Sequence, residues 1–123
     1  MSSNVTYKYI RQNPDIHTYI KNADAAVKAQ GYTEHSFAHV EKAADTVKMI
    51  LEGLGYDERK VELGMIAAYL HDIGNVINRI DHAQSGAVMA FRLLDNLNMP
   101  AEEICDIISV SYTHLRAHET LRH

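Results

Sequence analysis

The sequence predicts an all-helical domain of about five helices. Apolar residues recur every three or four positions along most of the 123-residue chain, and this spacing places side chains on one face of a helix. No segment shows the apolar–polar alternation of a half-buried strand, and no internal repeat is present. A chain of this length is expected to form one domain around a single core.

The first helix is expected to run from Asn13 to Gly31. Asn13 is a favourable N-cap, and Pro14 fits the first helical position because its missing N–H has no partner there anyway. Residues 1–12 are polar and are expected to form a flexible N-terminal segment ahead of a helical domain at 13–109.

The second helix follows the polar turn 32–35, carries His39 in its first turns, and is ended by Gly53 and Gly55. Its apolar positions repeat at helical spacing and are Val40, Ala43, Val47, Ile50 and Leu54. Asp57 is the expected N-cap of a third helix.

The third helix loses its polar face after Glu62, so we expect it to be the buried central helix. Gly64 is unfavourable inside a helix by about 1 kcal/mol relative to alanine, which indicates close packing against a neighbouring helix. His71 and Asp72 end this helix, and Gly74 turns the chain away.

A fourth helix is predicted after Asp81, with His82 in its first turn, and a fifth after Pro100. The apolar positions of these two helices are Ala87, Phe91, Leu94, Leu97, Ile104, Ile107 and Ile108.

The last residues follow a different pattern. Residue for residue, the stretch from Val110 to Thr120 resembles one translated reading frame of a common transposase-based sequencing adapter. We therefore expect 110–123 to be an artefactual tail, and the helical domain to be partial, missing its C-terminal helices. The alternative is that His114, His118 and His123 form a metal-binding cluster, since His114 and His118 are four residues apart and so share one helix face.

Composition excludes several classes of function. The formal charge of −4 and the lack of a basic stripe argue against a nucleic-acid partner. A lone cysteine, Cys105, allows no intrachain disulfide, and Met1–Asp15 contains no apolar signal segment. We therefore expect a cytoplasmic protein with no membrane association; the sequence leaves its oligomeric state open.

Four residues able to bind a metal lie at expected helix ends: His39, His71, Asp72 and His82. Helix ends that meet at one edge of a bundle can bring such side chains together around a divalent cation, and imidazole and carboxylate ligands suit Mn, Fe, Zn or similar ions. A carboxylate ending an apolar run needs a compensating cation or several hydrogen bonds. A buried helix cap or a salt bridge for Asp72 is the alternative.

The order of His39 followed by the pair His71-Asp72 resembles the HD-domain superfamily of metal-dependent phosphohydrolases, which is all-helical and named for its His-Asp pair. The resemblance covers about Gly31 to Ile108. It implies that these three residues bind a divalent metal ion (Mn, Fe, Mg, Co or Zn), and that one or two ions are held. Asp72 would bridge the ions in a binuclear site, and His71 and Asp72 would be the catalytic centre.

The resemblance further implies that His82 binds a second metal and that His35, one turn before His39, is an additional ligand. The expected substrate is a nucleotide or another small phosphorylated metabolite, hydrolysed by metal-activated water. Arg79 and Lys42 are candidate contacts to the substrate phosphate, or else solvated surface groups.

The chain departs from the family pattern at two points. Asn75 stands where the branch that hydrolyses cyclic dinucleotides typically has lysine, so such a substrate is not supported. The family's final aspartate on a later helix has no counterpart here. Two other functions therefore stay open: a non-catalytic HD module that binds a nucleotide or a protein partner, and an inactive fragment of the enzyme.

Overall fold

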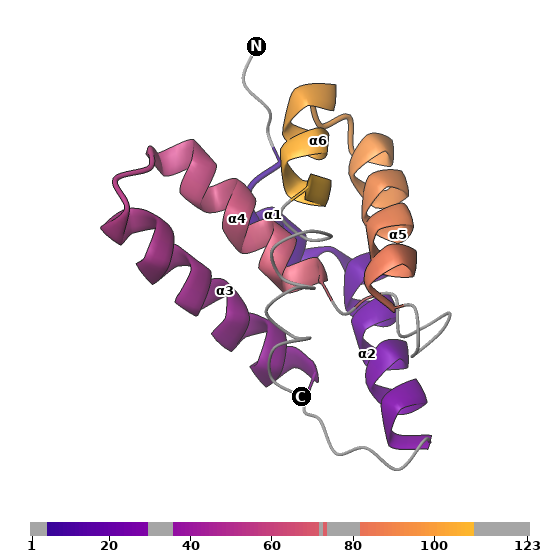
Figure 1. Cartoon of the computed structure of the whole chain (residues 1–123). Helices are drawn as coiled ribbons and strands as arrows, with labels where there is room; N and C mark the ends of the chain where they lie inside the picture. Colours follow the sequence, from indigo (N-terminus) through magenta and orange to yellow (C-terminus); the bar gives the residue numbers. More distant parts are fainter. Residues whose placement is uncertain (1–4, 30–35, 72, 74–81, 110–123) are drawn as a thin grey trace.

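A computed structural model describes residues 5–29, 36–71, 73 and 82–109, and within these residues all regular structure is helical (Figure 1). The described helices are α1 (Tyr7–Gln12), α2 (Pro14–Ala29), α3 (Ser36–Gly53), α4 (Glu58–Leu70), α5 (His82–Asn96) and α6 (Ala101–Ser109). The all-helical class is thus confirmed, with one helix more than the five predicted.

The additional helix is α1, which lies where the sequence predicted a flexible segment. The Thr6 hydroxyl accepts a hydrogen bond from the backbone N–H of Tyr9 at 3.1 Å and caps this helix. Val5 and Ile10 are buried, and Ile10 has no exposed surface. A six-residue helix spans fewer than two turns, so its sequence has no periodicity to recognise.

Two predicted N-caps are confirmed by hydrogen bonds. The Asn13 carboxamide oxygen accepts from the backbone N–H groups of Asp15 and Ile16, at 2.9 and 3.1 Å. The Asp57 carboxylate accepts from the backbone N–H of Lys60 at 2.9 Å. Both caps satisfy donors that a helix start leaves without a partner.

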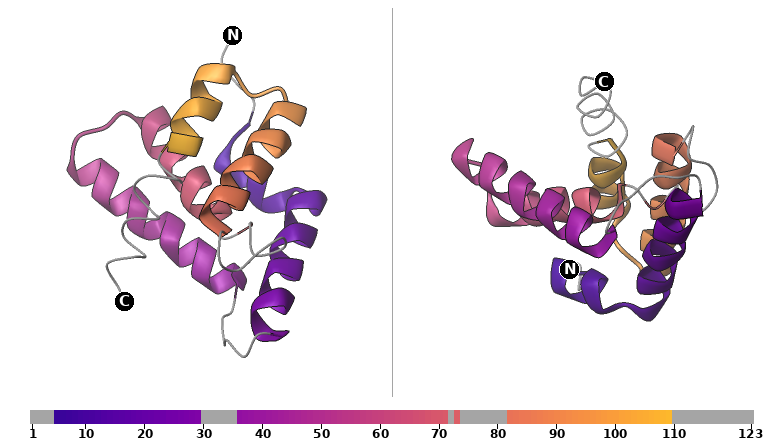
Figure 2. Two further views of the ribbon diagram at one scale, coloured as in Figure 1. Left: turned by 45° about the vertical axis from the view of Figure 1, so that its right-hand side comes forward. Right: turned by 90° about the horizontal axis from the view of Figure 1, so that it is seen from below.

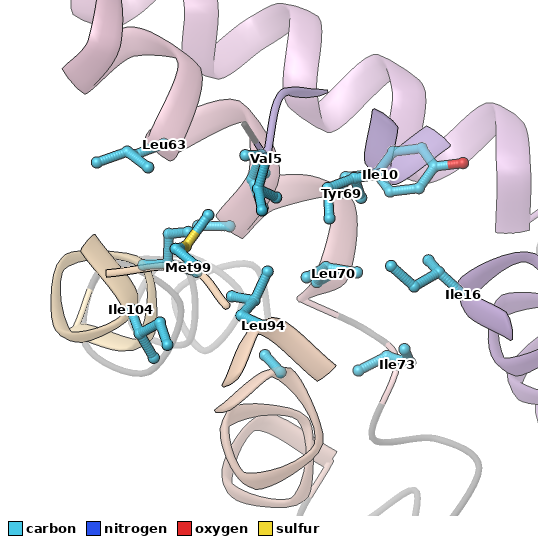
Figure 3. Close-up of a cluster of buried hydrophobic side chains, with 14 of the residues drawn as sticks. Val5, Ile10, Ile16, Leu63, Tyr69, Leu70, Ile73, Leu94, Met99 and Ile104 are labelled. Carbon is cyan, nitrogen blue, oxygen red and sulfur yellow. The ribbon is translucent and has the colours of Figure 1, made fainter. Parts of the chain in front are cut away.

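Helix α4 is the centre of the bundle, as its apolar sequence predicted. It packs along α3 and also contacts α1 and α6 (Figures 1 and 2). From Val61 to Leu70 every residue is buried except Glu62 and Met65, which are half-buried. Figure 3 shows side chains from several helices and from the segments next to them meeting in the core, among them Val5, Ile10, Ile16, Leu63, Tyr69, Leu70, Ile73, Leu94, Met99 and Ile104.

Gly64 explains how closely α3 and α4 approach each other. A Cβ atom at this position would lie 2.5 Å from Cδ1 of Leu51 and 3.0 Å from Cγ1 of Val47. Real Cβ atoms almost never come as close as the first distance. The close helix contact that the sequence predicted at this glycine is therefore confirmed.

The buried stripe of α3 is rotated from the predicted one. Val40 and Ala44 are buried and Leu51 is half-buried, whereas Ile50 and Leu54, two of the expected apolar positions, are 55% and 68% exposed. The apolar residues of α3 cover a wider face of the helix than α4 does. The spacing of these residues alone therefore does not show which of them are buried.

An ion-pair network holds the N-terminal segment and α6 against α4. Arg59 donates to both carboxylate oxygens of Glu103, to Glu62, and to the backbone carbonyl of Val5, over distances of 2.7 to 3.0 Å. Glu62 in turn accepts from the backbone N–H of Tyr7 at 3.0 Å. This bidentate arrangement fixes α6 relative to α4 with a geometry that only arginine provides.

None of the described helices is long and apolar enough to cross a membrane.

Candidate metal centre

His71 is a buried polar residue at the end of the central helix. It is the C-cap of α4 and is only 7% exposed. Its Nδ1 lies 2.5 Å from the backbone carbonyl oxygen of Ala68. Because a carbonyl can only accept a hydrogen bond, Nδ1 must carry the proton when this bond forms, and the lone pair of the neutral ring is then on Nε2. Histidine ligands of metals are oriented in this way in many proteins.

His39 approaches His71 from the neighbouring helix. Helices α3 and α4 are antiparallel, so the first turns of α3 lie beside the last turn of α4 (Figure 1). His39 is half-buried, and its ring centroid lies 5.2 Å from that of His71, with the two planes tilted by 52°. The fold therefore brings together two histidines that are 32 positions apart in the sequence.

The separation of the two rings fits shared ligation of one ion. Two imidazoles whose nitrogens each lie about 2.0–2.1 Å from one metal have ring centroids roughly 4.5–5.5 Å apart. The observed centroid distance lies in this range, and one of the two rings is already oriented by a backbone carbonyl. The pair therefore suits two ligands of a metal site.

The remaining predicted site residues are only partly visible. Asp72, His35 and Arg79 lie outside the described residues. His82 is the first residue of α5, as predicted, but its side chain is not described. Lys42 lies on α3 one turn after His39 and is exposed. Among the residues that the structure describes, no group of three or more histidine, cysteine or acidic side chains gathers at one point.

One contributor to the site was not predicted, the carbonyl of Ala68. The last carbonyls of every helix lack intrahelical donors, so a histidine at a helix C-terminus can bind the carbonyl three residues before it. This pattern was available in the sequence, because Ala68 precedes His71 by three positions at the end of the predicted helix.

Comparison with known proteins gives a distant relative and a family. The uncharacterized protein MJ1020 of Methanocaldococcus jannaschii is 26% identical over 106 residues, which cover 74% of this chain and 41% of the relative. The chain thus spans less than half the length of this curated relative. No solved structure gives a significant match. The sequence profile of the HD domain matches residues 36–119, which include both histidines of the pair and most of the chain, and the chain therefore belongs to the HD-domain family.

Proposed function

We propose that the chain forms the metal-binding part of a phosphohydrolase that acts on a nucleotide or another small phosphorylated metabolite. The observation that carries this proposal is the pair of His39 and His71, which lies where two helix ends meet and has a spacing that suits one shared ion. Membership of the HD-domain family supports the same reaction class.

The proposed ligands of the first ion are His39, His71 and Asp72, with His82 and His35 as further ligands when two ions are held. A divalent cation, with Mn, Fe, Mg, Co and Zn as candidates, lowers the pKa of bound water and polarises a phosphoryl oxygen. The hydrogen bond from His71 to Ala68 holds one imidazole ready for coordination.

Two cationic side chains are candidates for contact with the substrate phosphate. Lys42 is exposed on α3, one turn beyond His39, so a phosphate at the metal site lies on its side of the helix. Arg79 belongs to the segment between α4 and α5, which leads from Asp72 to His82 in the sequence. The carboxylate of Asp72 is assigned to orienting the attacking water, because it directly follows the buried ligand His71 in the sequence.

The test combines metal content with turnover. The chain is loaded with Mn²⁺, Fe²⁺ or Zn²⁺, its bound metal is measured by elemental analysis, and hydrolysis of p-nitrophenyl phosphate, its diester and a nucleotide panel is followed. His39→Ala and Asp72→Ala are expected to lose the metal and the activity together. His17→Ala is the matched control for metal content, because His17 is an exposed histidine on α2 and its loss should leave the bound metal unchanged.

Two outcomes would overturn the proposal. Full activity of Asp72→Ala would remove that residue from the reaction. A folded, metal-loaded chain that binds nucleotides but hydrolyses none of the panel would instead favour a non-catalytic binding module.

A further inference from the structure

A hollow on the surface is lined by neither histidine of the pair. It has a volume of about 570 Å³ and is lined by residues of four helices, which are Tyr7, Lys8, Arg11, Gln12, His17, Phe37, Glu41 and Tyr69. Pockets that bind small molecules in proteins usually measure about 300–1,000 Å³, so this one is large enough for a ligand such as a mononucleotide.

Half of the residues that line the hollow carry an aromatic ring. Tyr7 and Tyr69 meet edge to face, with ring centroids 5.6 Å apart. His17 and Phe37 are stacked, with centroids 4.5 Å apart and planes inclined by 26°. Four rings around one hollow form a surface on which a planar ring can stack or make edge contacts. Nucleobases stack favourably on aromatic side chains, whichever base is present.

Charge around the hollow is divided between two helices. Both cations, Lys8 and Arg11, lie on α1, whereas Glu41, and Asp45 one turn beyond it, lie on α3. Arg11 is held by an ion pair with Glu41 at 3.0 Å and lies over the ring of Tyr7, 5.5 Å from its centroid.

Lys8 differs from Arg11 because it is exposed and makes no ion pair within the part of the chain that the structure describes. An anionic group on a ligand would therefore be placed over α1, next to Lys8.

Neither His39 nor His71 lines the hollow, although the lining includes residues close to each of them in the sequence. Phe37 precedes His39 by two residues on α3, and Tyr69 precedes His71 by two residues at the end of α4. Two residues correspond to about 200° around a helix, so each aromatic residue points away from the histidine that follows it. A ligand in the hollow would therefore contact side chains other than the two histidines.

We propose that this hollow is a second ligand site, which binds a planar heteroaromatic ring carrying an anionic group, and that a nucleoside monophosphate is the matching chemical class. The ring lies among the four aromatic side chains and the phosphate lies beside Lys8. The site stands apart from the hydrolytic one, so its ligand is not the substrate of the metal centre.

The test is calorimetric titration of the full chain with adenosine monophosphate, with adenosine and inorganic phosphate as separate probes. The monophosphate is expected to bind at least tenfold more tightly than either part. Lys8→Glu and His17→Ala, which change exposed residues, should each weaken its binding about tenfold. Lys48→Glu, an equivalent charge reversal at an exposed position of α3 outside the lining, is the matched control and should change nothing.

A cross-comparison separates this site from the metal centre. His39→Ala should lose metal and keep monophosphate binding, whereas His17→Ala should keep metal and lose monophosphate affinity. Circular dichroism of each variant confirms folding. Two results would overturn the proposal: no binding of the monophosphate by the folded chain, or binding that is lost in His39→Ala and unaffected by Lys8→Glu, which would assign it to the metal centre.

Discussion

Gly64 is where the contact between α3 and α4 can be tested most directly. In Gly64→Ala the new Cβ would lie 2.5 Å from Cδ1 of Leu51 and 3.0 Å from Cγ1 of Val47. The half-buried Leu51 side chain can turn away, since its end is flexible. Val47 is β-branched and has one preferred rotamer in a helix, so relief there requires the helices to separate slightly.

Two opposing terms set the size of the effect. Alanine is favoured over glycine inside a helix by about 1 kcal/mol, whereas inserting a methyl group into a packed contact costs roughly 1–3 kcal/mol. We expect Gly64→Ala to lower the free energy of unfolding by about 1 kcal/mol. The matched control is Gly53→Ala at the exposed end of α3, where a Cβ atom would meet nothing within 4 Å. This control should stabilise the protein by about 0.5 kcal/mol.

Thermal and urea unfolding of the two variants provide the measurement. A difference of roughly 1 kcal/mol corresponds to about 2–8 °C in Tm for domains of this size. Adding Leu51→Ala should offset part of the loss in Gly64→Ala, with a coupling of about 0.5 kcal/mol or more in a double-mutant cycle. If Gly64→Ala is as stable as Gly53→Ala, the two helices are not packed as closely as described, and the spacing of the histidine pair loses its structural support.

Three further predictions concern the first helix and two titrating groups. Ile10→Ala, at a fully buried position, should cost about 2–5 kcal/mol in urea unfolding, whereas Tyr9→Ala, at a position 47% exposed, should cost far less. The hydrogen bonds from Arg59 hold the pKa of Glu103 below its ordinary value of 4.5. The ionised carboxylate therefore stabilises the fold above pH 4.5, and this stabilisation is lost as the pH falls through the lowered pKa. In Glu103→Gln, the free energy of unfolding should decrease less steeply at acid pH. Burial raises the pKa of Tyr7 to about 12, so the contribution of this hydroxyl to folding stability is full below pH 10.0 and is lost as the pH rises through 12. An ultraviolet titration should lose one late-ionising tyrosine in Tyr7→Phe. An unchanged titration would contradict the burial of this hydroxyl.

Local signals in the sequence were enough to predict most of the helices. Asn13 and Asp57 are caps whose hydrogen bonds form within three residues, so they depend little on the rest of the fold. The central position of α4 followed from its lack of a polar face, and the close contact at Gly64 from a glycine that a helix would otherwise disfavour.

Other features depended on partners distant in the sequence. Helix α1 is too short to show a repeating apolar pattern in its sequence. It is held in place by burial of Ile10 and by the hydrogen bond from the backbone N–H of Tyr7 to the Glu62 carboxylate. Ile50 is exposed because of where α4 packs on α3, and the spacing of apolar residues in α3 does not show that position.

For the candidate metal centre, the sequence was enough to predict candidate ligands, to place His39, His71 and His82 at helix ends, and to show the resemblance to the HD domain. The contact between the rings of His39 and His71 could not be predicted from the sequence, because antiparallel packing of α3 on α4 sets the 5.2 Å between their centroids. The aromatic hollow depended on tertiary structure entirely. Its lining comes from four helices whose side chains share no sequence motif, and only the packed bundle places them together.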